Sequence, residues 1–151
     1  MHFRFIRAEQ TLELRAKVLK PFLQPHECVV PGDDDPNGFH LGASLELDGP
    51  LIGIASFMME RHPALFLEHQ NHARLRGMAS DPTVRRRGVG RGLVLRGLQE
   101  LGPRGADLLW FNARANAFAF YESLGFLYAS EMFDLPQIGP HKVMYKALSR
   151  R

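Results

Sequence analysis

The sequence predicts one domain with a mixed sheet, of the α/β (α+β) class, and three observations support this prediction. The chain has 151 residues, which fits a single domain of about 100–200 residues. Hydrophobic residues make up 45% and charged residues 23%, close to the averages of about 45–50% and about 25% for globular domains. Apolar residues alternate in some segments and recur at helical spacing in others, in the order βαββ-βαβαββ.

The first half of the chain predicts a strand, a helix and a hairpin. His2–Arg7 alternates apolar and polar residues, and Thr11–Leu19 has helical apolar spacing that Pro21 ends. A loop rich in Pro, Asp and Gly follows. Phe39–Leu47 and Leu51–Met59 are then expected to pair as antiparallel strands, because a short turn with Asp, Gly and Pro joins them.

The second half predicts two strand–helix pairs. Leu75–Ser80 is typical of a short buried strand, and Val89–Leu101 has one apolar helical stripe before a Gly-Pro stop. Asp107–Asn112 indicates a second buried strand. The stripe over Ala117–Leu124 indicates a second helix, which Gly125 ends.

The chain is expected to finish with two more strands. Phe126–Leu135 and His141–Leu148 flank a turn with Pro at both ends. Glu60–Gln70 has no pattern that assigns it. The acidic run Asp33–Asp35 is expected to lie in a solvated loop.

Composition excludes several classes of protein. No apolar run approaches the about 18–20 residues of a membrane span, and the first residues lack a signal-peptide pattern. The single cysteine, Cys28, has no disulfide partner, which favours a reducing cytoplasm. The net charge is only +3, and the basic segment Arg74–Arg104 lacks the interleaved aromatic residues that base stacking requires. We therefore expect a cytoplasmic protein that binds neither membranes nor nucleic acid.

The segment Leu75–Leu93 holds the pattern that indicates chemistry: a strand, an arginine-rich turn and a glycine-rich helix start. Unpaired N–H groups in the first turn of a helix bind anions, and glycine lets a phosphate approach the backbone. Gly88, Gly90 and Gly92 do not have the G-x-G-x-x-G spacing of a dinucleotide fold. No P-loop motif occurs in the chain either.

Two motifs resemble the GNAT superfamily of acyl-CoA-dependent N-acyltransferases. Arg85–Gly90 is similar to the family's (Gln/Arg)-x-x-Gly-x-(Gly/Ala) loop, which holds the coenzyme A pyrophosphate. Ala117–Phe126 is similar to the family's Ala-x-x-(Phe/Leu)-Tyr-x-x-x-Gly-Phe segment. Ile138–Lys146 and Phe39–Ala43 further resemble a bacterial branch, the ElaA-like proteins.

The resemblance implies a GNAT-like mixed sheet of about six to seven strands with flanking helices, spanning residues 1–151 as one domain. It implies acetyl-CoA as co-substrate and Tyr121 as the proton donor to the departing thiolate. It places backbone N–H groups near Met78 and Ala79 at the reacting oxygen. The expected contacts with CoA are Met78, Ala79, Ser80, Arg85, Arg86, Arg87, Gly88, Val89, Gly90, Arg91, Gly92, Asn112, Ala117 and Phe120.

One position departs from the family pattern. Many family members carry Asn three residues before the Ala that opens the second motif, where this chain has Arg114. Asn112 and Asn116 lie on either side of it. Which of the three contacts CoA is left open by the sequence.

Acetyl transfer to an amine also requires a base, because an amine of pKa about 10.4 is protonated at neutral pH. The sequence offers four candidates and does not choose among them: His40, Glu68, His72 and His141. A metal site at His62, His69 and His72 lacks helical spacing and a carboxylate, so no metal is expected. A covalent route through Cys28 lacks an adjacent base, so direct transfer in a ternary complex is favoured.

The prediction is therefore an acetyltransferase that uses acetyl-CoA and a primary amine of a small molecule or peptide. A non-catalytic acyl-CoA sensor or interaction domain is the alternative, because it would keep the phosphate loop without transfer. The acceptor, and whether the protein is a monomer or homodimer, stay open.

Overall fold

The computed structural model describes residues 1–149. It has one open sheet of eight strands, in the order β1-β2-β3-β4-β5-β8-β6 with β7 paired to β8. This is the mixed sheet predicted from the sequence, with one strand more than expected. The strands are β1 (His2–Ile6), β2 (Phe39–Ser44), β3 (Leu51–Met59), β4 (His72–Ser80), β5 (Leu108–Arg114), β6 (Leu127–Tyr128), β7 (Phe133–Leu135) and β8 (Gly139–Ala147).

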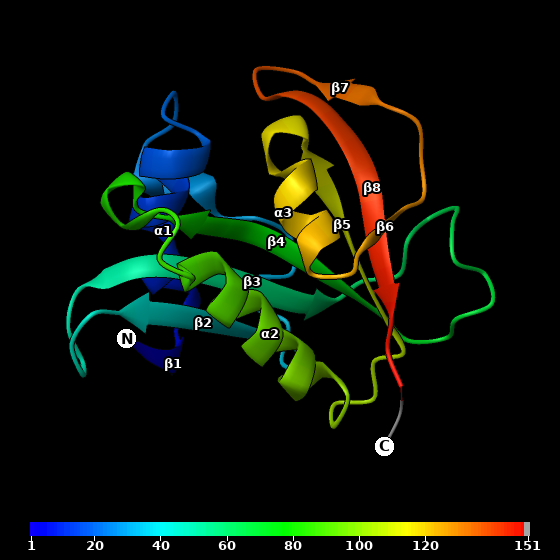
Figure 1. Ribbon diagram of the computed structural model, residues 1–151, viewed down its shortest axis with the longest axis horizontal. Coiled ribbons are helices and arrows are strands. Elements are labelled where there is room, and N and C mark those ends of the chain that lie inside the picture. The colour runs from blue at the N-terminus through cyan, green and yellow to red at the C-terminus, as the bar shows by residue number, and fades with distance from the viewer. Residues whose placement is uncertain (150–151) are drawn as a thin grey trace.

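Helices cover both faces of this sheet (Figure 1). Ile54 packs with Leu14 of the N-terminal helix (residues 8–19), whereas its neighbour Ala55 lies in the cluster that holds Leu93 of α2 (Val89–Leu101). Because successive strand residues point to opposite faces, the N-terminal helix and α2 lie on opposite sides of β3. The helical segments are η1 (Ala8–Thr11), α1 (Leu12–Leu14), η2 (Arg15–Leu19), η3 (Pro25–Cys28), η4 (Pro82–Val84), α2 (Val89–Leu101), η5 (Ala115–Ala117) and α3 (Phe118–Ser123).

The N-terminal helix is longer and less regular than predicted. It begins at Ala8 rather than Thr11 and passes through 3₁₀, α and π turns before it ends at Leu19. The hairpin also differs from the prediction, because β2 ends at Ser44 instead of Leu47. The alternation of apolar and polar residues continues to Leu47, but the strand does not, and the Leu47 side chain is 74% exposed.

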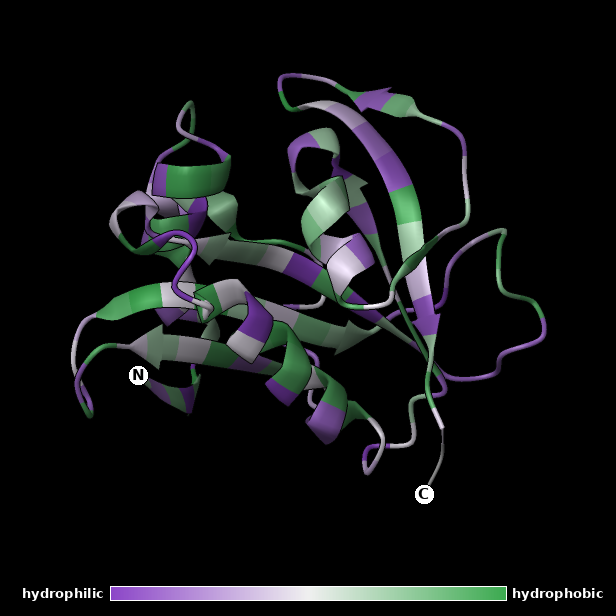
Figure 2. Cartoon of the chain, in the orientation of Figure 1, coloured by the Kyte–Doolittle hydropathy of each residue, from purple (hydrophilic) through white to green (hydrophobic). Residues whose placement is uncertain are grey.

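Helix α2 is confirmed with the predicted bounds, and its glycines explain how closely it packs. A Cβ at Gly97 would lie 2.0 Å from the Phe57 ring, so only glycine allows this approach. The opposite side of α2 carries hydrophilic residues, and the ribbon alternates between the two colours (Figure 2). The main hydrophobic cluster therefore lies between α2, α3 and the central strands.

The last third of the chain corrects one predicted strand. Phe126–Leu135 forms two short strands, β6 and β7, instead of one. Both pair with β8, at different places along its length. Within residues 1–149, no helix is both long and apolar enough to cross a bilayer.

The strands β4 and β5 separate soon after they begin, and this separation positions the site. Their parallel pairing covers only His72–Arg74 against Leu108–Trp110. Beyond it, β5 and β8 turn away from β4 (Figure 1). Backbone groups of β4 that face the gap from Leu75 onward have no partner on β5.

Candidate functional site

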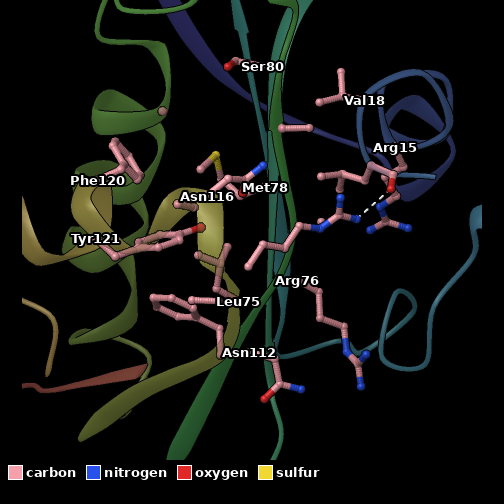
Figure 3. Close-up of a pocket in the computed structure, with 18 of the residues that line it drawn as sticks. Arg15, Val18, Leu75, Arg76, Met78, Ser80, Asn112, Asn116, Phe120 and Tyr121 are labelled. Atoms are coloured by element: carbon pink, nitrogen blue, oxygen red, sulfur yellow. Dashed lines mark hydrogen bonds between the residues drawn. The ribbon is translucent and has the colours of Figure 1, made fainter. Parts of the chain in front are cut away.

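A cavity of about 760 Å³ occupies the gap between β4 and β5. This volume lies within the range of about 300–1,000 Å³ typical of ligand sites. Figure 3 shows Phe120 and Tyr121 on one side of β4 and Arg15 and Val18 on the other. The cavity therefore connects the face of the sheet covered by α2 and α3 with the face covered by the N-terminal helix.

The N-terminus of α2 opens into this cavity and presents free backbone N–H groups. The first backbone hydrogen bond of the helix runs from the Gly92 N–H to the Gly88 carbonyl at 2.9 Å. The N–H groups of Val89, Gly90 and Arg91 therefore lack intrahelical acceptors. They lie at the positive end of a helix of 13 residues, where an anion is stabilised.

The turn before α2 shows why the chain has glycine there. Gly88 has φ +82°, a conformation that other residues rarely adopt, and a Cβ there would meet open space. At Gly90 a Cβ would lie 3.2 Å from the Phe120 ring. Both glycines line the cavity, so their backbone is open to a ligand. Gly88 and Gly90, together with the free N–H groups at the start of α2, therefore fit the pyrophosphate of CoA.

Two of the residues predicted to contact CoA lie elsewhere. Arg85, Arg86 and Arg91 line the cavity, but Arg87 does not. Gly92 also does not, because it faces β1: a Cβ there would lie 2.2 Å from the Phe3 ring. The glycine at position 92 thus allows α2 to pack closely on Phe3, and the structure gives no support to the prediction that it contacts the cofactor.

Strand β4 has an irregularity where the predicted oxyanion-binding residues lie. The register with β3 shifts between Ser56↔Arg76 and Ile54↔Ala79, and Gly77 has φ +61°. Two residues of β4, Gly77 and Met78, thus oppose one residue of β3, as in a β-bulge. Met78, Ala79 and Ser80 all line the cavity.

Tyr121 lies in α3 and is 6% exposed, with its ring packed 4.3 Å from that of Phe111. Its hydroxyl is directed toward β4 (Figure 3) and has no hydrogen-bond partner among residues 1–149. Burial raises the pKa of Tyr121 well above its ordinary value, so the phenol stays protonated at neutral pH. The phenol can therefore donate a hydrogen bond or a proton. Because its pKa is raised, complete proton transfer from Tyr121 to a thiolate is less favourable than transfer from a free tyrosine.

The remaining residues predicted for CoA also reach the cavity. The three alternative contacts with CoA, Asn112, Arg114 and Asn116, all line it together with Ala117 and Phe120. Asn112 and Arg114 lie on the face of β5 opposite Phe111 and Ala113, because strand residues alternate. Arg114 donates a hydrogen bond to the Leu19 carbonyl at 2.7 Å, across the gap to the N-terminal helix.

Among the four candidate bases, only His141 lines the cavity. Its Nδ1 lies 2.7 Å from the Gly139 carbonyl, which can only accept a hydrogen bond. Nδ1 therefore carries the proton of the neutral ring, and Nε2 keeps a lone pair. No partner for Nε2 exists among the described residues. This ring has the tautomer that a base requires.

His40 is committed to a buried network outside the cavity. Its Nδ1 lies 2.6 Å from the Ser56 hydroxyl and its Nε2 lies 2.9 Å from the Asp33 carbonyl. Arg15 donates to the same Ser56 hydroxyl and forms a paired ion contact with the Asp33 carboxylate at 2.7 and 2.8 Å. Burial would raise the pKa of Asp33, but the Arg15 hydrogen bonds lower it below its ordinary value.

His72 and Glu68 also lie outside the cavity. His72 is buried and organises the loop over residues 60–71, because its Nδ1 accepts from the His62 N–H at 3.0 Å and its Nε2 lies 2.9 Å from the Phe66 carbonyl. Glu68 is exposed on the same loop. This structural use of histidine explains the cluster that the sequence shows there. Within the described residues, no group of three or more His, Cys, Asp or Glu side chains is arranged to hold a metal.

Sequence reasoning did not assign several residues to the cavity wall, among them Arg15, Cys28 and Arg76. Arg15 and Cys28 come from the N-terminal helix and the loop after it, and Arg76 is on β4. The Cys28 Sγ–H donates weakly to the Gln24 carbonyl at 3.5 Å, and no base adjoins it. No local motif marks these residues, because only the tertiary fold brings them to the gap.

Comparison with known proteins gives consistent results. The sequence model of the acetyltransferase (GNAT) family matches residues 7–126. An uncharacterized N-acetyltransferase, YitI of Bacillus subtilis (strain 168), is 37% identical over 95% of this chain and 93% of its own.

Two solved structures are similar in fold. The crystal structure of Escherichia coli ElaA has a TM-score of 0.72 and 16% identity, over 96% of this chain and 98% of that one. An aminoglycoside 6'-N-acetyltransferase complexed with coenzyme A has a TM-score of 0.69 and 14% identity, over 100% of this chain and 99% of that one.

Proposed function

This chain belongs to the acetyltransferase (GNAT) family and is an acetyl-CoA-dependent N-acetyltransferase; we propose that it acetylates a primary amine of a small molecule or peptide by direct attack. One observation carries the proposal. A single cavity joins an anion-binding helix start, a buried tyrosine hydroxyl and a histidine with a free Nε2. These are the groups that a thioester donor and an amine acceptor require when both are bound.

The first task is to hold the donor. The N–H groups of Val89, Gly90 and Arg91 would bind the pyrophosphate of CoA, with Arg85 and Arg86 nearby on the cavity wall. Bound acetyl-CoA supplies an activated acyl group. The pyrophosphate site lies on the α2 side, so the pantetheine arm would run along the unpaired edge of β4 toward the gap.

The second task is to deprotonate the amine. We assign this step to His141, whose Nε2 is free and whose tautomer is fixed by Gly139. Freeing the lone pair of an amine with pKa about 10.4 at neutral pH costs on the order of 4–5 kcal/mol. Accepting the proton on imidazole, whose free pKa is about 6.5, offsets part of that cost.

The third task is to stabilise the negative oxygen that forms when the amine attacks the acyl carbon. Met78 and Ala79, at the irregular part of β4, line the cavity beyond the pairing with β5, and their backbone N–H groups would be the hydrogen-bond donors. A preorganised N–H in a dry site lowers such a barrier substantially. The strand separation thus supplies the donor without any charged side chain.

The last task is to stabilise the departing thiolate. Tyr121 is protonated and its hydroxyl is free, so it can donate a hydrogen bond or a proton to the sulfur. Direct transfer is preferred over an acyl-cysteine route, because the Sγ of Cys28 contacts a carbonyl and no base.

The proposal is tested by incubating the purified protein with acetyl-CoA and a panel of amines while free thiol and product mass are followed. We expect thiol release that depends on the amine and a matching acetylated product. CoA binding without transfer to any amine would contradict the proposal and favour a sensor.

A further inference from the structure

We propose that the acceptor is a short amine that also carries a carboxylate, and that Arg114 and Arg76 bind this carboxylate. This inference deepens the proposed function and rests on it. It starts from the charges of the cavity wall, which are all of one sign. Among residues 1–149, no Asp or Glu lines the cavity, whereas Arg residues line both ends and Lys20 lines one of them.

The basic residues divide into two groups. Arg85, Arg86 and Arg91 surround the start of α2, where the phosphates of CoA would neutralise them. The second group lies toward the N-terminal helix, on the other face of the sheet. It comprises Arg15, Lys20, Arg74, Arg76 and Arg114. CoA phosphates at the α2 end leave this second group without a counter-ion from the donor.

Protein carboxylates neutralise only part of the second group. Asp33 pairs with Arg15. Glu60 is shared, because Arg74 contacts it at 2.5 Å and Arg76 at 3.1 Å. One carboxylate thus contacts two guanidinium groups, so Glu60 neutralises only one of these two positive charges.

Arg114 contacts only a carbonyl oxygen, and burial lowers its pKa because the charged form is desolvated. No carboxylate partner for Arg114 or Lys20 exists among residues 1–149. The acceptor end thus has a surplus of positive charge in a partly desolvated space.

Arg114 lies next to His141, the proposed base, so the excess positive charge is close to the site where the amine would be deprotonated. Arg114 on β5 pairs directly with His141 on β8, so the two side chains share one face of the sheet. Directly opposed side chains in an antiparallel pair begin about 4.5–5.5 Å apart at Cβ. A short acceptor with its amine at the Nε2 of His141 would therefore place a second functional group near the Arg114 guanidinium. A bidentate arginine–carboxylate contact fits this arrangement.

Arg76 lies on the same side of the sheet. It pairs with Ser56 of β3, whose hydroxyl accepts from Arg15. The Nε of Arg76 is buried and has no acceptor, so Glu60 does not satisfy the whole guanidinium. Both arginines thus approach the gap from the strands that border it. A polycationic acceptor, such as an aminoglycoside or a polyamine, would be repelled by this excess of positive charge.

A binding experiment tests the charge preference without any turnover. The protein is saturated with CoA, and its melting temperature is measured with three five-carbon probes: glutarate, glutaramide and 1,5-diaminopentane. We expect glutarate alone to add a further shift. Arg114→Gln and Arg76→Gln should lose this shift and keep the shift caused by CoA, which also shows that they fold.

Arg7→Gln is the matched control, because Arg7 is exposed and pairs only with Glu9. This variant should respond to glutarate like the wild type. No added shift from glutarate, an equal shift from the diamine, or an unchanged shift in both cavity variants would overturn the inference.

A turnover experiment separates the two proposals. Glycine, β-alanine and 4-aminobutyrate are each compared with their carboxamides, and spermidine is included. We expect kcat/KM about ten-fold or more higher for carboxylates than for their amides, and a ratio near one in Arg114→Gln. Equal rates, or fastest transfer to spermidine, contradict the carboxylate site. Transfer to no amine contradicts the proposed function, and the glutarate experiment then decides the carboxylate site alone.

Discussion

The two ends of the cavity are built in different ways. The end at α2 centres on one continuous segment, residues 85–91, which ends in backbone N–H groups without intrahelical acceptors. The end at the N-terminal helix comes from side chains of several distant segments, among them Arg15, Arg76, Arg114 and His141. A local backbone motif can bind a donor common to a family, whereas an assembly of side chains can change with each acceptor. Variants that disable one end at a time test whether the two ends have these separate roles.

The largest effect is expected at the α2 end. Gly90→Leu keeps a good helix former in the helix but places a side chain where the pyrophosphate would bind. At 100 times its dissociation constant, CoA should stabilise the wild type by about 2.7 kcal/mol, a melting shift of about 5–10 °C. The variant should lose this shift.

Gly102→Leu at the other end of α2 is the control, because Gly102 has φ −56° and a Cβ there meets only the Ser149 carbonyl at 3.9 Å. It should keep the CoA shift. A full shift in Gly90→Leu would mean that CoA binds elsewhere.

The next effect is expected where the two ends meet. Tyr121→Phe removes a hydroxyl that has no hydrogen-bond partner among residues 1–149, so stability and CoA binding should change little. Turnover should fall by about 10²–10⁴. Tyr128→Phe is the control, since the Tyr128 hydroxyl donates to Glu122 on the exposed surface. Normal turnover in Tyr121→Phe would remove this residue from the mechanism.

A smaller effect is expected at the acceptor end. His141→Gln should lower kcat/KM for the amine by about 10–10² and flatten the acidic limb of its pH profile. CoA binding should not change. His40→Gln should lower stability and leave the shape of the pH profile intact, because both His40 nitrogens are held in the buried network. An altered pH profile in His40→Gln together with an unaltered profile in His141→Gln would show that His141 is not the base.

The smallest effect concerns the ion pair behind the acceptor end. The pKa of Asp33 is lowered in the folded state, so this carboxylate stabilises the protein above its unfolded pKa near 3.8. That stability is lost as the pH falls below 3.8 through the folded pKa. Asp33→Asn should therefore be less stable than the wild type at neutral pH, and the difference should shrink in acid. Denaturant unfolding at several pH values measures it, and a constant difference would contradict this account.

The same contrast explains how much could be predicted from the sequence. The helix Val89–Leu101 follows from local spacing, and its bounds were confirmed. Anion binding at its start follows from glycine chemistry and stays a prediction. Gly92 was assigned to the ligand because sequence does not show which way a helix glycine faces. The four candidate bases stayed equal, because in the sequence a histidine held in a buried hydrogen-bond network looks the same as a histidine that faces a cavity. Their difference depends on strand register and distant partners.

A structure of the complex with coenzyme A would show directly whether the start of α2 binds the donor. We expect pyrophosphate oxygens about 2.7–3.2 Å from the N–H groups of Val89 and Gly90, with the sulfur beside the Tyr121 hydroxyl in the gap between β4 and β5. We also expect that the space beside His141 and Arg114 stays open for the acceptor. A pyrophosphate away from the start of α2, or a pantetheine arm that fills the space at His141, would contradict these expectations.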